Sequence, residues 1–284
     1  MEDKITKKVD LNFVFILTLV YFFVELIGGI YYNSLALVTD ASFMAINIAG
    51  QLLTIFAEKI SKKPPDEHNT FGYLRIKVIS ALFNGILVGF VIFYIFIEAY
   101  KRILNPEPIY TEKVLIIAVL GLIVNGIGIY KIYKYTNDIN IKGAFLHILT
   151  DTLGSIGVII SAILIEYTKL YFIDAVASIL ISLLVAYPTY FLLKDSIHIL
   201  MEGNPRDIKQ EDIKNFLLSN FNYIKSIKDI RIWALTPDIV IAVFRVRTKN
   251  KYYSRENIKK IKEELKNKFG FYDVYVEIYE EGKK

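Results

Sequence analysis

Six apolar segments dominate the first two thirds of the chain, and each is long enough to cross a lipid bilayer as a helix. Spanning the hydrocarbon core takes about 20 helical residues. The segments cover residues 11–32, 35–57, 78–99, 114–132, 143–165 and 171–193. They predict an α-helical membrane protein with six transmembrane helices and exclude a soluble enzyme. The first segment is too long for the apolar part of a signal peptide, so we expect it to remain as a span.

Lysine and arginine are distributed unevenly between the connecting loops. They gather before the first segment and in the loops after the second and fourth, whereas the loops after the first, third and fifth hold few. Because positively charged loops stay inside, we expect a multi-pass protein of the cell membrane with both termini cytoplasmic. The formal net charge of +5 arises mainly in the C-terminal tail, and we expect the lipid bilayer and no nucleic acid as a partner.

The last part of the chain is polar and reads as a small soluble domain. Helical periodicity at 209–219 and 254–269 alternates with strand-like segments at 226–235, 239–248 and 271–279. This αββαβ order predicts a ferredoxin-like α+β cytoplasmic domain over residues 204–284, after a transport domain over 1–203. Thr236, Pro237 and Asp238 are expected to turn the hairpin, and Ser254 to cap the second helix.

Ionisable side chains inside the spans need a reason to be there, because a charge at mid-bilayer costs about 2.5–3.5 kcal/mol. His147 and Asp151 are four residues apart and therefore share one helix face. They suit either a hydrogen-bonded pair that holds helices together or a cation site; the presence of Asp40 and Asn47 on the second span favours the cation site. The chain has no cysteine, so nitrogen and oxygen atoms would have to hold any metal.

Three other polar residues in the spans suit structural roles, and one of them also suits a ligand role. Asp40 lies near the outer end of its segment and is interpreted equally well as a helix cap or as a metal ligand. Glu25 and Asn125 are interpreted as structural hydrogen-bonding groups within the helix bundle. A membrane enzyme is disfavoured, because no nucleophile and base stand together in the sequence.

Several short motifs are distributed along nearly the whole chain. The motifs are SLALVTDA at 34–41, DEHNTFGYLR at 66–75, EAYKRILNPEPI at 98–109, HILTD at 147–151, FID at 172–174, MEGNP at 201–205 and KDIRIWALTP at 228–237. In sequence and in order they resemble the motifs of the cation diffusion facilitator (cation efflux) family, in particular its zinc and cobalt efflux branch.

The resemblance implies a secondary transporter and not an enzyme. It implies a homodimer, joined through the cytoplasmic domain, in which each protomer exports a divalent cation, by default Zn²⁺, while protons enter. No resident cofactor is implied. Family members bind the transported ion with two ligands on the second helix and two on the fifth. The fifth-helix pair matches His147 and Asp151, but the second-helix positions are Phe43 and Asn47.

Other motif positions also depart from the family. Where a peripheral metal site would lie, the sequence has Asn69 and Tyr73, and His68 has no histidine partner. Where the cytoplasmic domain often carries histidines, it has Lys228 and Arg231. We therefore expect neither of these accessory metal sites.

Two functions remain open after this comparison of motifs. The first is efflux through a site of His147, Asp151, Asn47 and Asp40, whose oxygen ligands would extend the choice of ion from Zn²⁺ to Mn²⁺, Fe²⁺ or Co²⁺. The second is a transport-poor family member that acts as a dimer partner or regulatory subunit, because Phe43 cannot bind metal. The intact pair on the fifth helix favours transport.

Overall fold

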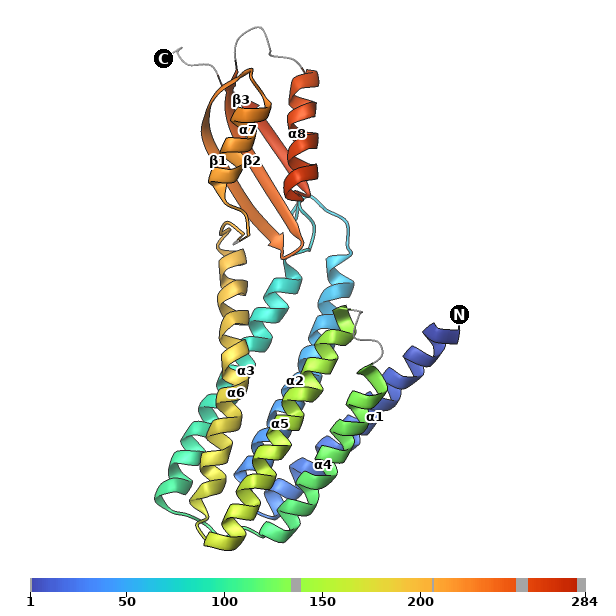
Figure 1. Ribbon diagram of the computed structural model, residues 1–284, viewed down its shortest axis with the longest axis vertical. Helices are drawn as coiled ribbons and strands as arrows, with labels where there is room; N and C mark the ends of the chain where they lie inside the picture. The colour runs from blue at the N-terminus through green and yellow to red at the C-terminus, as the bar shows by residue number, and fades with distance from the viewer. Residues whose placement is uncertain (1, 134–138, 206, 249–254, 280–284) are drawn as a thin grey trace. The chain divides into compact units, whose positions relative to one another are not determined.

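The computed structural model describes residues 2–133, 139–205, 207–248 and 255–279, without side-chain detail for residues 2–12 and 139–144 (Figure 1). Six long helices come first. They are α1 (Glu2–Tyr31), α2 (Leu35–Ser61), α3 (Ile76–Leu104), α4 (Thr111–Ile132), α5 (Ile139–Thr168) and α6 (Phe172–Leu200). Each is long and apolar enough to cross a membrane, so the prediction of six transmembrane helices is confirmed for the described residues.

Several helices extend beyond the apolar segments that predicted them. The helix α3 continues to Leu104 through Lys101 and Arg102, and α5 begins at Ile139, before its apolar segment. Helix geometry does not stop at the edge of the hydrocarbon layer, because the backbone hydrogen bonds continue into the polar zone. Hydropathy alone therefore underestimated the helix lengths.

Contacts divide the chain into two compact units, Met1–Leu53 with Phe83–Phe191, and Thr54–Leu82 with Leu192–Lys284. The core of the first unit is apolar and includes Leu37, Phe43 and Val158. Many large apolar side chains of its helices are instead exposed, Phe90 and Leu180 among them. In a bilayer such side chains meet lipid, where exposure of apolar surface carries no penalty.

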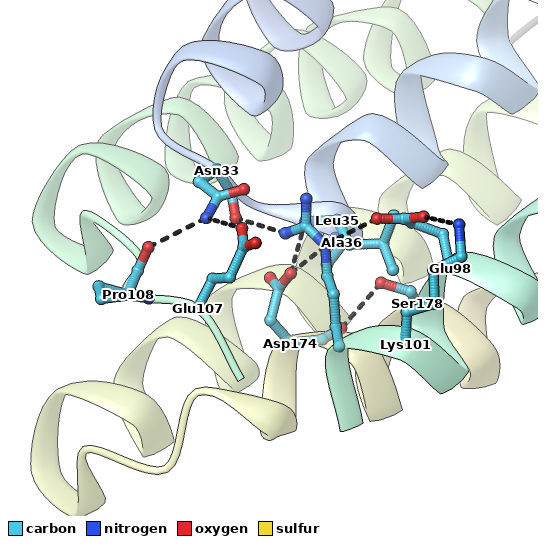
Figure 2. A network of polar contacts seen from close by, with 10 residues as sticks. Asn33, Leu35, Ala36, Glu98, Lys101, Glu107, Pro108, Asp174 and Ser178 are labelled. Carbon is cyan, nitrogen blue, oxygen red and sulfur yellow. Dashed lines mark hydrogen bonds and ion pairs between the residues drawn. The ribbon is translucent and has the colours of Figure 1, made fainter. Parts of the chain in front are cut away.

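A network of polar contacts joins the N-terminal end of α2, and the loop just before it, to α6 and α3 (Figure 2). Ser34 is the N-cap of α2, and its hydroxyl accepts a hydrogen bond from the Leu37 amide at 3.3 Å. The Asp174 carboxylate of α6 accepts hydrogen bonds from the Ser34 hydroxyl at 2.7 Å and from the first amides of α2. Arg102 of α3 donates to the Asn33 carbonyl at 2.8 Å.

The C-terminal elements are α7 (Gln210–Asn220), β1 (Ile224–Thr236), β2 (Ile239–Thr248), α8 (Arg255–Phe269) and β3 (Asp273–Ile278). The strands form one sheet in the order β1-β2-β3, antiparallel between β1 and β2 and parallel between β2 and β3. The predicted αββαβ fold is confirmed. The hairpin turns after Thr236, as predicted; the predicted cap at Ser254 lies outside the described residues.

Two helices cover the sheet through side chains at helical spacing (Figure 1). Ile213 and Leu217 of α7 are four residues apart and fully buried, as are Ile261 and Leu265 of α8. Both pairs pack in one core with Phe244 of β2. The parallel β2–β3 pair requires the crossover that α8 provides. The boundary between residues 203 and 204 stays a prediction.

Candidate metal centre

His147 and Asp151 lie one turn apart on α5, as their spacing predicted. Their side chains approach to 3.9 Å between Nε2 and Oδ2, with 32% and 6% of each side chain exposed. The imidazole and the carboxylate thus address the same region of the bundle, which suits a shared ligand. Both are ordinary ligands for divalent transition metals.

Asp40 of α2 lies against α5, and the residue is 3% exposed. A Cβ atom added to Gly154 of α5 would lie only 2.6 Å from Asp40 Oδ1, so the absence of a side chain there admits the carboxylate. The interpretation of Asp40 as a helix cap does not fit, because α2 begins at Leu35 and Ser34 caps it. Asp40 therefore stands beside Asp151, within the interior of the bundle.

Phe43 and Asn47 of α2 occupy the two positions that carry metal ligands in the family, and their surroundings differ. Phe43 is 3% exposed and belongs to the apolar core, so it supplies no ligand. Asn47 is half-buried, and no hydrogen bond joins it to His147 or Asp151 among the described residues. Within the described ranges, no three His, Asp or Glu side chains are arranged to hold a metal ion. The four-residue site expected from the sequence stays a prediction.

Glu25 of α1 is a further member of this region. Its side chain is completely buried and accepts a hydrogen bond from the Tyr21 hydroxyl at 3.2 Å, which agrees with the structural role expected for it. Its second oxygen, Oε2, has no hydrogen-bond partner. Glu25 also lies close enough to Asp40 for the two carboxyl groups to interact. The sequence signal was a glutamate inside an apolar span; its neighbours were not predictable.

The loop between α2 and α3 has a structural organisation of its own. Asp66 accepts hydrogen bonds from the His68 and Asn69 amides at 3.0 and 2.6 Å and from the Tyr73 hydroxyl at 2.6 Å. These bonds hold the pKa of Asp66 below its usual value, and the same carboxylate raises the pKa of Tyr73. Asn69 and Tyr73 thus help to order this turn through Asp66.

The motif residues Lys228 and Arg231, and His198 near the end of α6, also have structural partners. The Lys228 ammonium group lies over the face of the Tyr279 ring, and Arg231 Nε forms an ion pair with Asp229 Oδ2 at 2.9 Å. His198 Nε2 lies 2.8 Å from the Asn204 carbonyl oxygen, which makes it a packing residue at the end of α6. None of these contacts suggests a second metal site.

Comparison of the chain with known proteins identifies its family. The cation efflux transmembrane domain matches residues 11–201, which is more than half of the chain. The chain belongs to the cation efflux family. The resemblance seen in the short motifs is thereby confirmed.

Several curated cation efflux proteins are similar to this chain over most of its length. "Cation efflux system protein CzcD" of Alcaligenes sp. (strain CT14) is 38% identical over 78% of this chain and 70% of its own. "Cadmium, cobalt and zinc/H(+)-K(+) antiporter" of Bacillus velezensis is 38% identical over 78% and 72%, respectively. "Zinc transporter ZitB" of Escherichia coli (strain K12) is 33% identical over 78% and 72%.

Membership of the cation efflux family establishes the general class of activity. The chain is a multi-pass membrane protein of a family that moves metal cations across membranes, and the family is not a class of enzymes. The retained His147 and Asp151 lie within the matched domain, as do Asp40 and Glu25. The candidate site therefore lies within the matched domain.

Proposed function

We propose that the protein exports a divalent metal cation from the cytoplasm across the cell membrane in exchange for protons. The observation that carries this proposal is the His147–Asp151 pair, held one turn apart inside a helix bundle of the cation efflux family. An imidazole and a carboxylate facing each other in a bundle mark an ion path more often than a structural contact.

The names of the relatives support a transition-metal substrate. They mention zinc, cadmium and cobalt, and two of them are named as antiporters of these metals with H⁺ and K⁺. Zn²⁺ is our default substrate, with Mn²⁺, Fe²⁺ and Co²⁺ as further candidates, because Asn47 and Asp40 offer oxygen in place of a second imidazole. No resident cofactor is needed, since the metal is cargo.

The proposed cycle couples metal and protons at the same ligands. Deprotonated His147 and Asp151 bind the cation on the cytoplasmic side, with Asn47 and Asp40 as the further ligands of the site. After the helices re-expose the site to the outside, protonation of these ligands releases the metal. The cytoplasmic domain, residues 204–284, would join two protomers into a homodimer.

Transport in reconstituted vesicles tests this function. The purified protein is placed in vesicles with a pH gradient, and Zn²⁺, Mn²⁺, Co²⁺ and Fe²⁺ uptake is measured in turn. We expect gradient-dependent uptake of at least one metal, reduced to background by Asp151→Asn. Glu166→Gln, which makes the same chemical change at an exposed part of α5, serves as the matched control. Absence of uptake of every metal would overturn the proposal.

A second function is favoured by one observation, the burial of Phe43 in the apolar core at a family ligand position. A protein that lost this ligand could act as a dimer partner or regulatory subunit with little transport of its own. Wild type would then move no metal, and Phe43→Asp would gain zinc uptake. Uptake by the wild-type protein alone excludes this alternative.

A further inference from the structure

We propose that the polar contacts at the start of α2 form a latch that keeps this end of the helix bundle closed, and that export requires Arg102 to release Asn33. The latch consists of the contacts that Asn33 and Ser34 make with Arg102, Glu107 and Asp174. The proposed function places this end of the bundle outside, so the latch controls the exit of the cation. The inference rests on the proposed function for this direction, but its test requires neither metal nor transport.

The turn between α1 and α2 is held by α3 and by the loop after α3 (Figure 2). Arg102 Nη1 donates a hydrogen bond to the Asn33 carbonyl oxygen at 2.8 Å. The Asn33 side-chain amide donates to Glu107 Oε2 at 2.9 Å and to the Pro108 carbonyl oxygen at 3.2 Å. Asn33 has a φ of +59°, a left-handed conformation that asparagine tolerates better than most residues. Contacts from α3 and its following loop therefore fix this turn in one conformation.

Directly after this turn, α2 is packed tightly against its neighbours. Every residue from Ser34 to Asp40 except Val38 is buried. Leu35 lies in an apolar cluster with Ala99 of α3 and Ala175 of α6. Small side chains such as alanine let helices in a membrane approach closely. The first two turns of α2 are therefore enclosed by neighbouring helices, with the polar contacts of the latch at their outer edge.

The packing is looser toward the other end of the same helices. Gln51, about three turns beyond Asp40 on α2, is exposed. On α5, His147 has 32% of its side chain exposed, whereas Asp151, one turn nearer the latch, has 6%. The candidate metal centre is therefore more accessible from the His147 side than from the latch side. A carrier that exposes its site alternately has to reverse this difference before it can release the ion.

Arg102 is the member of the latch that can release. Asp174 is 1% exposed and accepts hydrogen bonds from Ser34 and from the first amides of α2, so its departure would leave buried donors unsatisfied. Arg102 has 21% of its side chain exposed, and water can satisfy both groups once its bond to Asn33 breaks. Its Nε lies 3.6 Å from Glu98 Oε1 on its own helix. The guanidinium thus keeps a charged partner after release, which gives the latch a bound and a released arrangement.

Thiol labelling in intact cells tests the latch, because the chain contains no cysteine. Val158→Cys places a reporter two turns beyond Asp151 on the same face of α5, at a residue 0% exposed. In this background we expect Arg102→Gln to speed labelling by a membrane-impermeant maleimide at least about tenfold, because losing a hydrogen bond from a charged group shifts an equilibrium by that much. The control Lys101→Gln removes an exposed charge from the same turn of α3 and should change the rate less than about twofold.

A second variant, Asn33→Gly, distinguishes the latch from a general loss of stability. Glycine adopts the left-handed conformation without strain and keeps the carbonyl that accepts from Arg102, but it loses the side-chain bonds to Glu107 and Pro108. We expect labelling of the Val158→Cys reporter to be faster than with the wild-type turn and slower than with Arg102→Gln. The apparent melting temperature in detergent should change little, since the glycine relieves backbone strain.

Two results would overturn the inference. The first is equal labelling rates for Arg102→Gln and Lys101→Gln. The second is faster labelling of Arg102→Gln together with a lower melting temperature, while Asn33→Gly is labelled as slowly as the protein with the wild-type turn. In either case, metal uptake by the wild-type protein would still uphold the proposed function. Conversely, faster labelling of both latch variants in a protein that takes up no metal upholds the latch and overturns the proposed function.

Discussion

Single residues decide where the α2 carboxylate meets α5. Gly154 leaves room for Asp40, whereas Gly157, one turn away, has only ordinary contacts, the nearest being Ile181 Cγ1 at 3.6 Å from an added Cβ. Phe43 fills the neighbouring family position with a ring in the apolar core. At this scale, α2 presents a buried carboxylate at Asp40 and an aromatic ring about one turn later, at Phe43.

Gly154→Ala is expected to lower metal uptake about tenfold or more, because the new methyl group displaces Asp40 from α5. The fold should survive, since alanine favours a helix more than glycine does. Gly157→Ala is the control with the same chemical change on the same helix. Equal uptake by the two variants, measured in vesicles, would show that the position of Asp40 does not matter.

At the scale of elements, hydrogen bonds to Asp174 hold the N-terminus of α2 against α6. Asp174 accepts hydrogen bonds from the Leu35 and Ala36 amides at 2.5 and 3.2 Å, and from Ser34. The free amides at a helix N-terminus carry partial positive charge, which a carboxylate satisfies. These hydrogen bonds help to position α2, the helix that carries Asp40.

Asp174→Ala is expected to destabilise the protein by about 2–4 kcal/mol, because it leaves buried donors unsatisfied. The apparent melting temperature in detergent should fall. For Asp174→Asn, which keeps one acceptor oxygen, the melting temperature should fall less. Glu112→Gln, at the start of α4 with 81% of its side chain exposed, is the control. A melting temperature for Asp174→Ala equal to that of the control would contradict this role.

At the scale of the whole molecule, alternate loops of a six-span protein lie on opposite sides of the membrane. The loops after α1, α3 and α5 hold few positive charges, so we predict that they face outward. The chain contains no cysteine, which allows a single engineered thiol to report its own location.

Pro106→Cys, in the exposed loop after α3, should react with a membrane-impermeant maleimide in intact cells. Glu67→Cys, in the exposed loop after α2, should react only after the membrane is opened. Labelling is measured by the mass shift of the purified protein. The reverse pattern would place the termini outside and contradict the proposed direction of export.

The secondary structure was largely predictable from the sequence. Hydropathy runs and period-2 alternation are local properties, so six spans and the αββαβ order followed from them, as did the turn after Thr236. The pairing of His147 with Asp151 followed from helix geometry in the same way. Family membership followed from the order of the motifs.

Long-range packing decided what local patterns could not. The sequence left Asp40 open between a cap and a ligand; only the contact with Gly154 and the cap at Ser34 placed it in the bundle. Asp174 reaches a partner about 140 residues away, and Glu25 meets Asp40 across two helices. Which side chains share a buried space depends on helix rotation and close packing, which no periodicity encodes.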